Sequence, residues 1–525
     1  MSASREKRSR QGTQEEILNQ KLAAEAEQKA KKKKNTLIGI AVTLVVVLLI
    51  GSIVLVNGPF FLHSTVAVTT GSHELSPVQV RYYYLDSYQQ MVNSGYGSIL
   101  SMMYGEQTDI SQVVYDDTTG QTWSEYVMET AVEDIRTSYA IYDDAMANGY
   151  TLSEDGAAAL TQAMNTIDLY AQMYGVSTDV YLSNIYGRGA NRETYEAYQN
   201  VLAIVNEYQV MKSETYNYDE ATLKATYEAD PSLYDVYTYR SYLVSVNNDD
   251  GTKPEGDALT AAMEETKATA EKMAADSEGN EQSYLASCVK VSGNEAHLDG
   301  ELTLRRNVRQ ESMSLSIREW VTDPAREAGD TAAIEYEGNG YYVVYFLGSD
   351  DNDYDAWNIR SIYINATTTD ADGNSVIDFE AVQPQVDALM ADVEASADLL
   401  ADMDDLAMTF SDDESTYSTG GIYEYVSKAN FDETVTEWLF ADGRAVGDYE
   451  LIQTETGFYF VYVEENAGNY RDYLISVDLM LDDFNAWHAE VTANATATVV
   501  EDGMKRVHTS LLTPASSNGT NTYVS

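Results

Sequence analysis

A pattern of five fixed residues occurs twice in the second half of this 525-residue chain. It reads Glu-Trp-x5-Arg-x2-Gly-Asp, and its two copies span residues 319–330 and 437–448. After a short turn, each copy is followed by an apolar, aromatic run, at 341–345 and 458–462. A repeat of this kind indicates that one structural unit is used twice.

The flanking segments repeat at nearly the same spacing. Ser241 and Tyr342 are 101 positions apart, and Ser361 and Tyr459 are 98 apart. The sequence therefore predicts two tandem domains of ordinary size, over residues 231–349 and 355–466. Each alternates strand-like and helix-like patterns, which predicts an α+β fold.

The charge of the chain is distributed unevenly. Residues 1–35 carry ten Lys and Arg against five Asp and Glu, whereas the rest of the chain carries 22 against 80. A surface with a net charge of about −58 repels phosphates, so we exclude nucleic-acid binding.

Residues 36–57 predict a membrane anchor. The run Thr36–Val56 contains no charged side chain over 21 residues, which is long enough to cross a bilayer as a helix. It follows four consecutive lysines, 31–34, so the positive-inside rule places the basic tail 1–35 in the cytoplasm and the rest outside. The alternative is a cleaved signal peptide, whose apolar region is shorter.

The single cysteine, Cys288, excludes an intramolecular disulfide. An exported chain without disulfides fits a bacterial envelope better than a eukaryotic secretory route. We interpret Cys288 as a small apolar residue in a helix. The sequence predicts no cofactor and no metal site.

Residues 70–230 read as a helical domain, with apolar residues at intervals of three to four. Asn148-Gly149 predicts the end of one helix, and Ser153 predicts the start of the next. The region is rich in Tyr and Met. We expect most of them to pack in a core, while the alternative is that some line a cleft for unfolded chains.

The link between the tandem domains, residues 349–355, is acidic. Asp351, Asp353 and Asp355 have the spacing of an EF-hand loop, but Ala356 and Ile362 stand where that loop needs Gly and Glu. We therefore predict a solvated linker. Residues 467–510 predict a C-terminal helix and strand, and 511–525 a disordered tail.

The second repeat resembles the parvulin rotamases. The resemblance is carried by Phe410-Ser411-Asp412-Asp413, Gly420-Gly421, Trp438-Leu439-Phe440, Val446-Gly447-Asp448 and Thr456 to Val461. The chain from about 70 to 500 is similar to the PrsA/SurA type of foldase. This resemblance implies a single transmembrane helix, a SurA-N-like helical chaperone domain, two tandem parvulin-like (FKBP-like β-α-β) domains and a C-terminal helix. The first of these domains is degenerate.

The resemblance also assigns site residues, in two groups. Phe431, Val435 and Phe440 match the socket for a proline ring. Asp413, Ser361, Tyr459 and Thr456 match polar positions beside the isomerising amide. Isomerisation of an X-Pro bond breaks no covalent bond, so the site only has to bind the twisted amide better than the planar one.

The sequence departs from the family at two positions. Parvulins usually have a histidine on the first strand and another on the last, where this chain has Ser361 and Tyr459. Two interpretations remain open. Either catalysis has been lost and the fold retained, or Ser361 and Tyr459 form a neutral hydrogen-bonded pair that suffices.

The sequence thus supports two functions. One is an extracytoplasmic, membrane-anchored peptidyl-prolyl isomerase with chaperone activity, whose partners are newly exported, unfolded polypeptides and their X-Pro segments. The other is an inactive holdase that uses the parvulin domains as scaffold. The third possibility, an envelope spacer or adhesin, leaves the socket pattern unexplained. The sequence does not define the oligomeric state.

Overall fold

The computed structural model describes residues 31–34, 42–47, 59–105, 109–247, 251–370 and 373–507. Most of the predicted anchor 36–57, most of the basic tail and the whole tail 511–525 lie outside these residues. Among the helices of the described segments, none is long and apolar enough to span a membrane. The chain divides into two compact units, residues 1–215 with 483–525 and residues 216–482.

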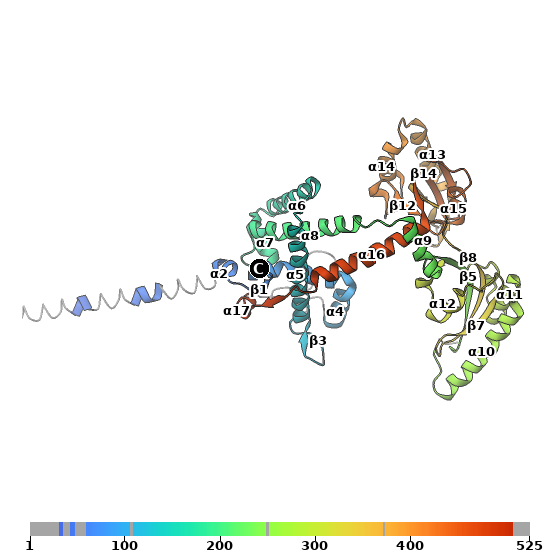
Figure 1. The fold of residues 1–525 in the computed structure, drawn as a ribbon, viewed down its shortest axis with the longest axis horizontal. Helices are drawn as coiled ribbons and strands as arrows, with labels where there is room; N and C mark the ends of the chain where they lie inside the picture. Colours follow the sequence, from blue (N-terminus) through green and yellow to red (C-terminus); the bar gives the residue numbers. More distant parts are fainter. Residues whose placement is uncertain are drawn as a thin grey trace, which may run out of the picture. The chain divides into compact units, whose positions relative to one another are not determined.

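The first unit is mainly helical (Figure 1). Its helices are α2 (Pro59–Ser64), α3 (Pro77–Met91), α4 (Gly97–Tyr104), α5 (Trp123–Ala147), α6 (Glu154–Met173), α7 (Thr178–Tyr186), α8 (Arg192–Glu214) and α17 (Glu501–Met504), with a π-helical turn, Val92–Tyr96, between α3 and α4. As predicted, α5 ends just before Asn148-Gly149, and the Ser153 side chain caps α6 by accepting a hydrogen bond from the backbone N–H of Gly156.

This unit also contains short strands; the sequence predicted a strand within residues 467–510 but none between 70 and 230. β1 (Val68–Thr70) pairs with β2 (His73–Leu75) and with β15 (Ala497–Val499), so that segments more than 400 positions apart share one sheet. A short hairpin joins β3 (Val114–Asp116) and β4 (Gln121–Thr122).

The tyrosine-rich segment of α3 supplies the core of this unit. Tyr82 and Tyr84 are fully buried, and Tyr82 packs against the rings of Tyr186, Tyr195 and Tyr198. The expectation that most Tyr and Met side chains of this region pack in a core therefore holds for α3. It fails for α4, where Met102 is 82% exposed.

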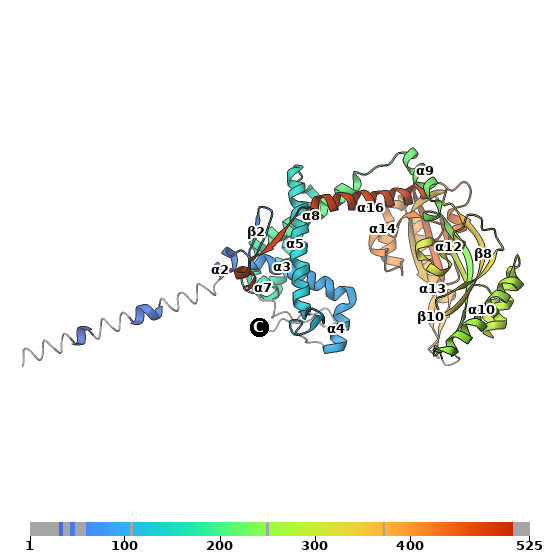
Figure 2. The same cartoon turned by 60° about the horizontal axis from the view of Figure 1, so that its bottom comes forward.

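The second unit contains the sequence repeat as two sheets of the same order. The first repeat comprises β5 (Val236–Ser245), α10 (Asp257–Ser277), α11 (Glu281–Ser292), β6 (Leu304–Arg309), α12 (Leu315–Val321), β7 (Thr331–Glu335) and β8 (Gly340–Asp350). The second comprises β9 (Asp355–Asn365), β10 (Thr367–Thr369), β11 (Ser375–Ile377), α13 (Phe379–Ala395), α14 (Leu399–Phe410), β12 (Ile422–Val426), α15 (Glu433–Leu439), β13 (Tyr449–Gln453) and β14 (Gly457–Asn469). The antiparallel sheets run β6-β5-β8-β7 and β12-β9-β14-β13, and α10 lies along the first sheet (Figure 2). α9 (Glu220–Ala229) precedes the repeats, and α16 (Tyr470–Thr492) follows them.

The repeated motif builds the same turn in each domain. In the second repeat, the guanidinium of Arg444 lies 3.6 Å from the ring centroid of Trp438. Its Nε donates to the Trp438 carbonyl (3.1 Å), and Nη1 donates to Oδ2 of Asp448 (3.2 Å). These contacts fix the turn that leads into β13.

The first repeat reproduces each of these contacts. Arg326 lies 4.2 Å from the ring centroid of Trp320, donates to its carbonyl (3.2 Å) and donates to Asp330 (3.3 Å). The motif is therefore an Arg–Trp stack with a carboxylate anchor. Its recurrence reflects the folding of each domain rather than a ligand site.

The two faces of the second sheet have separate cores. Ile362, Ile364, Phe458 and Phe460 pack against α13 and α14. Ile359, Val461 and Val463 pack on the opposite face with Val435 and Leu439 of α15. Because side chains alternate along a strand, Ser361, Tyr363 and Tyr459 share this second face.

Most aspartates of the link between the repeats are exposed, as the sequence predicted for a solvated linker, but the link is also anchored to the rest of the unit. Asn352 is 2% exposed, and its side-chain amide donates to the carbonyl of Tyr234 (2.7 Å). Arg471 pairs with both Asp351 (3.2 Å) and Asp353 (3.0 Å). A cation from α16 thus anchors the acidic residues. It lies more than 100 positions further along the chain, so no sequence pattern indicated this contact.

Candidate functional site

A continuous row of four aromatic rings crosses the α15 face of the second sheet. Tyr423 of β12 meets Phe431 at a centroid distance of 5.1 Å, and Phe431 meets Tyr459 of β14 at 5.6 Å. Tyr459 stacks on Tyr363 of β9 at 4.6 Å. We call these four residues the aromatic row. Rings in edge and offset contact form a rigid apolar surface.

The aromatic row has a carboxylate at one end. The hydroxyl of Tyr423 donates to Oδ2 of Asp413 (2.6 Å), which also accepts from the Thr416 hydroxyl. The other oxygen, Oδ1, accepts from the backbone N–H of Ser415 (3.0 Å) and from its hydroxyl (2.6 Å). Partial burial raises the pKa of Asp413, but these hydrogen bonds outweigh burial and lower the pKa to about 2. The carboxylate is therefore ionised at neutral pH.

A hydroxyl lies at the opposite end of the row. The phenol of Tyr363 donates to Oγ1 of Thr456 (3.0 Å), just before β14 begins. Burial is the main cause that raises the pKa of Tyr459 to about 12, and the neighbouring tyrosines and aspartates add to it. The row is thus neutral at its centre and anionic at one end.

The acidic loop, residues 411–419, is followed by two glycines that its geometry requires. Gly420 and Gly421 both have positive φ, at 72° and 71°. A Cβ on Gly421 would collide with the carbonyl of Ser361, and one on Gly420 would collide with the side chain of Asp404. The N–H of Ser361 donates to the Gly421 carbonyl (2.8 Å), so the loop is fastened to β9.

Comparison with known protein families identifies part of this unit. Residues 342–467, which begin within β8 and stop within β14, match the PPIC-type PPIase domain. This segment is therefore similar to the PPIC-type parvulins, and we call it the parvulin domain. The sheet β12-β9-β14-β13 and the aromatic row both lie within the parvulin domain.

Three solved structures align with a longer part of the chain, at low sequence identity. PrsA from Bacillus subtilis is 12% identical, with 76% of this chain and 93% of that chain covered, at a TM-score of 0.23. PrsA from Streptococcus pneumoniae is 12% identical, with 76% and 99% covered, at 0.18. A structure of the SurA-like chaperones PEB4 and Cj1289 of Campylobacter jejuni is 18% identical, with 41% and 78% covered, at 0.15. No curated protein sequence matches this chain. The family assignment therefore rests on the segment 342–467.

The parvulin domain brings four of the predicted site residues together. Asp413, Phe431, Tyr459 and Thr456 all belong to the row or to its ends. However, Asp413 uses both oxygens to hold its own loop, so its contribution to a ligand is a fixed negative charge rather than a free acceptor pair.

The other three predicted residues occupy different positions. Val435 is completely buried in the core beneath the row, where it supports Phe431. Phe440 packs edge-on against Tyr354 at 5.3 Å, at the junction with the first repeat. Ser361 is 2% exposed.

Ser361 and Tyr459 are not paired across the sheet, because Ser361 lies opposite Val461 and Tyr459 lies opposite Tyr363. The partner of Tyr459 is therefore a stacked ring, and sequence reasoning missed it. A signal existed, since Tyr363 follows Ser361 by two positions and so shares its face. Tyr423 was also missed, and no pattern points to it, because it reaches Asp413 only after the glycine turn closes the loop.

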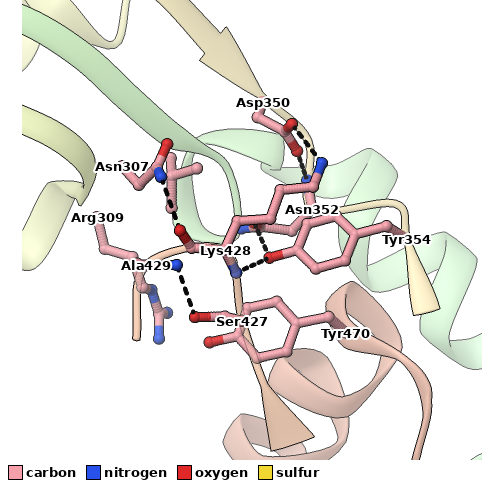
Figure 3. Close-up of a pocket in the computed structure, with 10 residues that line it drawn as sticks. Asn307, Arg309, Asp350, Asn352, Tyr354, Ser427, Lys428, Ala429 and Tyr470 are labelled. Atoms are coloured by element: carbon pink, nitrogen blue, oxygen red, sulfur yellow. Dashed lines mark hydrogen bonds and ion pairs between the residues drawn. The ribbon is translucent and has the colours of Figure 1, made fainter. Parts of the chain in front are cut away.

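A small polar cavity of about 100 Å³ lies at the junction of the two repeats (Figure 3). Lys428 is one of the residues that line it. Its Nζ pairs with Asp350 (3.1 Å) and lies 4.0 Å from the ring centroid of Tyr354. Its backbone N–H donates to the Tyr354 hydroxyl (3.2 Å) and its carbonyl accepts from Asn307 (3.4 Å). The ammonium group of Lys428 therefore joins the second repeat to Asp350, at the end of the first.

The acidic side chains of the described segments do not group into a metal site. Within the described segments, no cluster of three or more His, Cys, Asp or Glu side chains could hold an ion. The only cysteine, Cys288, is buried in α11, and burial raises its pKa to about 11, which keeps it a neutral thiol.

Proposed function

We propose that this protein is an extracytoplasmic folding factor, anchored to the cell membrane by residues 36–57, whose parvulin domain at 355–466 isomerises X-Pro bonds. The observation that carries this proposal is the aromatic row within a segment of the PPIC-type family. The partly buried rings of Phe431 and Tyr459 offer an apolar surface for a proline ring. A substrate bound there is removed from water. This loss of hydration favours the less polar twisted amide over the planar one.

The missing histidines do not conflict with this mechanism. No proton is transferred during isomerisation, so the site needs a fixed shape and a fixed field rather than a titrating group. Tyr459 stays neutral and is held between two rings. Asp413 stays ionised and places its charge at the Tyr423 end.

The first repeat, 231–349, has in our proposal a structural role as a second, degenerate parvulin-like domain. It has the same strand order, but Leu243 lies opposite Tyr342 where the second repeat pairs Tyr363 with Tyr459. It also lacks a counterpart of the Ser-Asp-Asp loop.

The test is an X-Pro peptide assay with the full-length chain. We expect it to accelerate cis-trans exchange of Ala-Ala-Pro-Phe, which otherwise takes tens of seconds. Phe431→Ala serves as the matched inactive form. A rate equal to that in buffer would defeat the isomerase function.

A second function, holding unfolded chains, is favoured by exposed side chains of the helical unit. Met102 and Met103 of α4, and Met173 and Tyr174 at the end of α6, are 61–82% exposed. Flexible thioethers and aromatic rings suit varied unfolded partners. We propose that the helical domain 70–230 is a SurA-N-like chaperone domain. An aggregating client should remain soluble in the presence of the chain, and unchanged light scattering would rule this function out.

A further inference from the structure

The second repeat carries far more negative charge than the first. Residues 355–466 contain 25 Asp and Glu against three Lys and Arg, a net charge of −22. Residues 231–349 contain 21 against ten, a net charge of −11. Because the two segments are similar in length, the excess acidity is concentrated on the repeat that carries the aromatic row.

The three cations of the second repeat are all engaged within the protein. Arg360 pairs with Glu464 (2.6 Å) and Asp404 (3.0 Å), Lys428 pairs with Asp350 (3.1 Å), and Arg444 pairs with Asp448 (3.2 Å) while stacking on Trp438. A ligand carboxylate at this domain would therefore meet carboxylates without a free cation to offset them.

Two of the carboxylates flank the aromatic row itself. Asp413 lies under Tyr423, and the four groups that bond its carboxylate are neutral donors, so they stabilise its charge without cancelling it. Asp432 follows Phe431 in sequence, is exposed, and caps α15 by accepting from the N–H of Val435 (3.1 Å). Burial is the main cause that raises the pKa of Tyr459, and both aspartates add smaller contributions.

We propose that this site selects X-Pro segments in which a lysine or arginine adjoins the proline. The aromatic row would take the proline ring and the aliphatic stem of the neighbouring side chain, and Asp413 and Asp432 would attract its cationic head. The field of the whole domain would add to this by steering basic segments toward the row. This selectivity rests on the proposed isomerase function and names its substrate class.

The experiment compares three tetrapeptides with the full-length chain at low salt: Ala-Lys-Pro-Phe, Ala-Ala-Pro-Phe and Ala-Glu-Pro-Phe. The acidic site should repel the glutamate peptide and attract the lysine peptide. We therefore expect kcat/KM to be roughly tenfold higher for the lysine peptide. The ratio should shrink at high salt, because exposed charges are screened.

A matched pair of variants locates the effect. Asp432→Asn removes one charge beside the row and keeps a good helix cap, so it should reduce the Lys/Glu ratio about two- to threefold. Asp392→Asn removes the same charge from an exposed position of α13, which covers the opposite face of the sheet, and should leave the ratio unchanged. Equal reductions in both variants would overturn a role for the row.

The outcomes separate the selectivity from the function on which it rests. Equal kcat/KM for all three peptides would overturn the selectivity and leave the isomerase intact. If no peptide exchanges faster than in buffer, the isomerase function fails, and fluorescence anisotropy of the same labelled peptides decides the selectivity. Tighter binding of the lysine peptide would then support it, and equal binding would overturn it.

Discussion

The hydroxyl of Tyr423 donates a 2.6 Å hydrogen bond to Oδ2 of Asp413. The two residues lie on either side of the Gly420–Gly421 turn, so this bond closes the acidic loop onto β12. It also connects a charged group to the first ring of the aromatic row. The loop is thus a closed structure in which the charge of Asp413 is held in place.

Removing that hydroxyl should destabilise the loop without disturbing the ring. We expect Tyr423→Phe to lower the free energy of unfolding by about 1–2 kcal/mol, because a partly buried carboxylate loses one of its donors. Urea denaturation at pH 7 measures the change. Tyr417→Phe, an exposed tyrosine of the same loop, is the control and should have no effect. Equal losses in the two variants would contradict the assigned hydrogen bond.

The ionisation of Asp413 predicts a dependence of stability on acidity. Its pKa is about 2 in the folded protein and about 3.9 in an unfolded chain. Its stabilising contribution is therefore complete above pH 4 and is lost as the pH falls from about 4 toward 2. Asp413→Asn should be less stable at pH 6 and should show a shallower decline over this range in urea titrations. Parallel curves for the two proteins would exclude the shift.

The Arg–Trp stack should contribute similarly to both repeats. Arg444→Lys keeps the charge but loses the planar stack on Trp438 and the fork of donors, so we expect a loss of roughly 1–2 kcal/mol. Arg326→Lys should cost about the same in the first repeat, because the contacts are the same. Differential scanning calorimetry of each variant measures the cost. A neutral result for both would show that the motif serves another purpose.

The rings of the aromatic row should matter more to isomerisation than the hydroxyl of Tyr459. Tyr459→Phe keeps the stack with Tyr363, and we expect kcat/KM to change less than about threefold. Phe431→Ala opens the centre of the row and should lower kcat/KM by more than about tenfold through lost apolar contact with proline. A large loss for Tyr459→Phe would instead show that the Tyr459 hydroxyl itself takes part in isomerisation.

The exposed methionines of α4 should support holding of unfolded chains. Met102→Ser with Met103→Ser removes apolar surface without disturbing the core, so protection of an aggregating client should fall at least about twofold. Leu315→Ser, at a residue of the second unit that is 78% exposed, is the matched control and should retain protection. Light scattering of the client provides the measurement.

The sequence by itself determined the features that depend on local pattern. Ser153 and Asn148-Gly149 defined helix ends because capping is decided within a few residues. The Glu-Trp-x5-Arg-x2-Gly-Asp repeat revealed two copies of one domain, because the Arg, Trp and Asp that it spaces bond to one another. Gly420 and Gly421 marked the loop that closes over β9, since a side chain at either position would collide with its neighbours.

The tertiary structure alone decided which residues form the site. Strand register placed Tyr363, not Ser361, opposite Tyr459. Packing buried Val435 completely and turned Phe440 toward Tyr354. The acidic link is anchored because Arg471, far along the chain, pairs with Asp351 and Asp353. A sequence pattern records which residues are neighbours within a helix or strand, whereas contacts between distant elements depend on how the chain closes on itself.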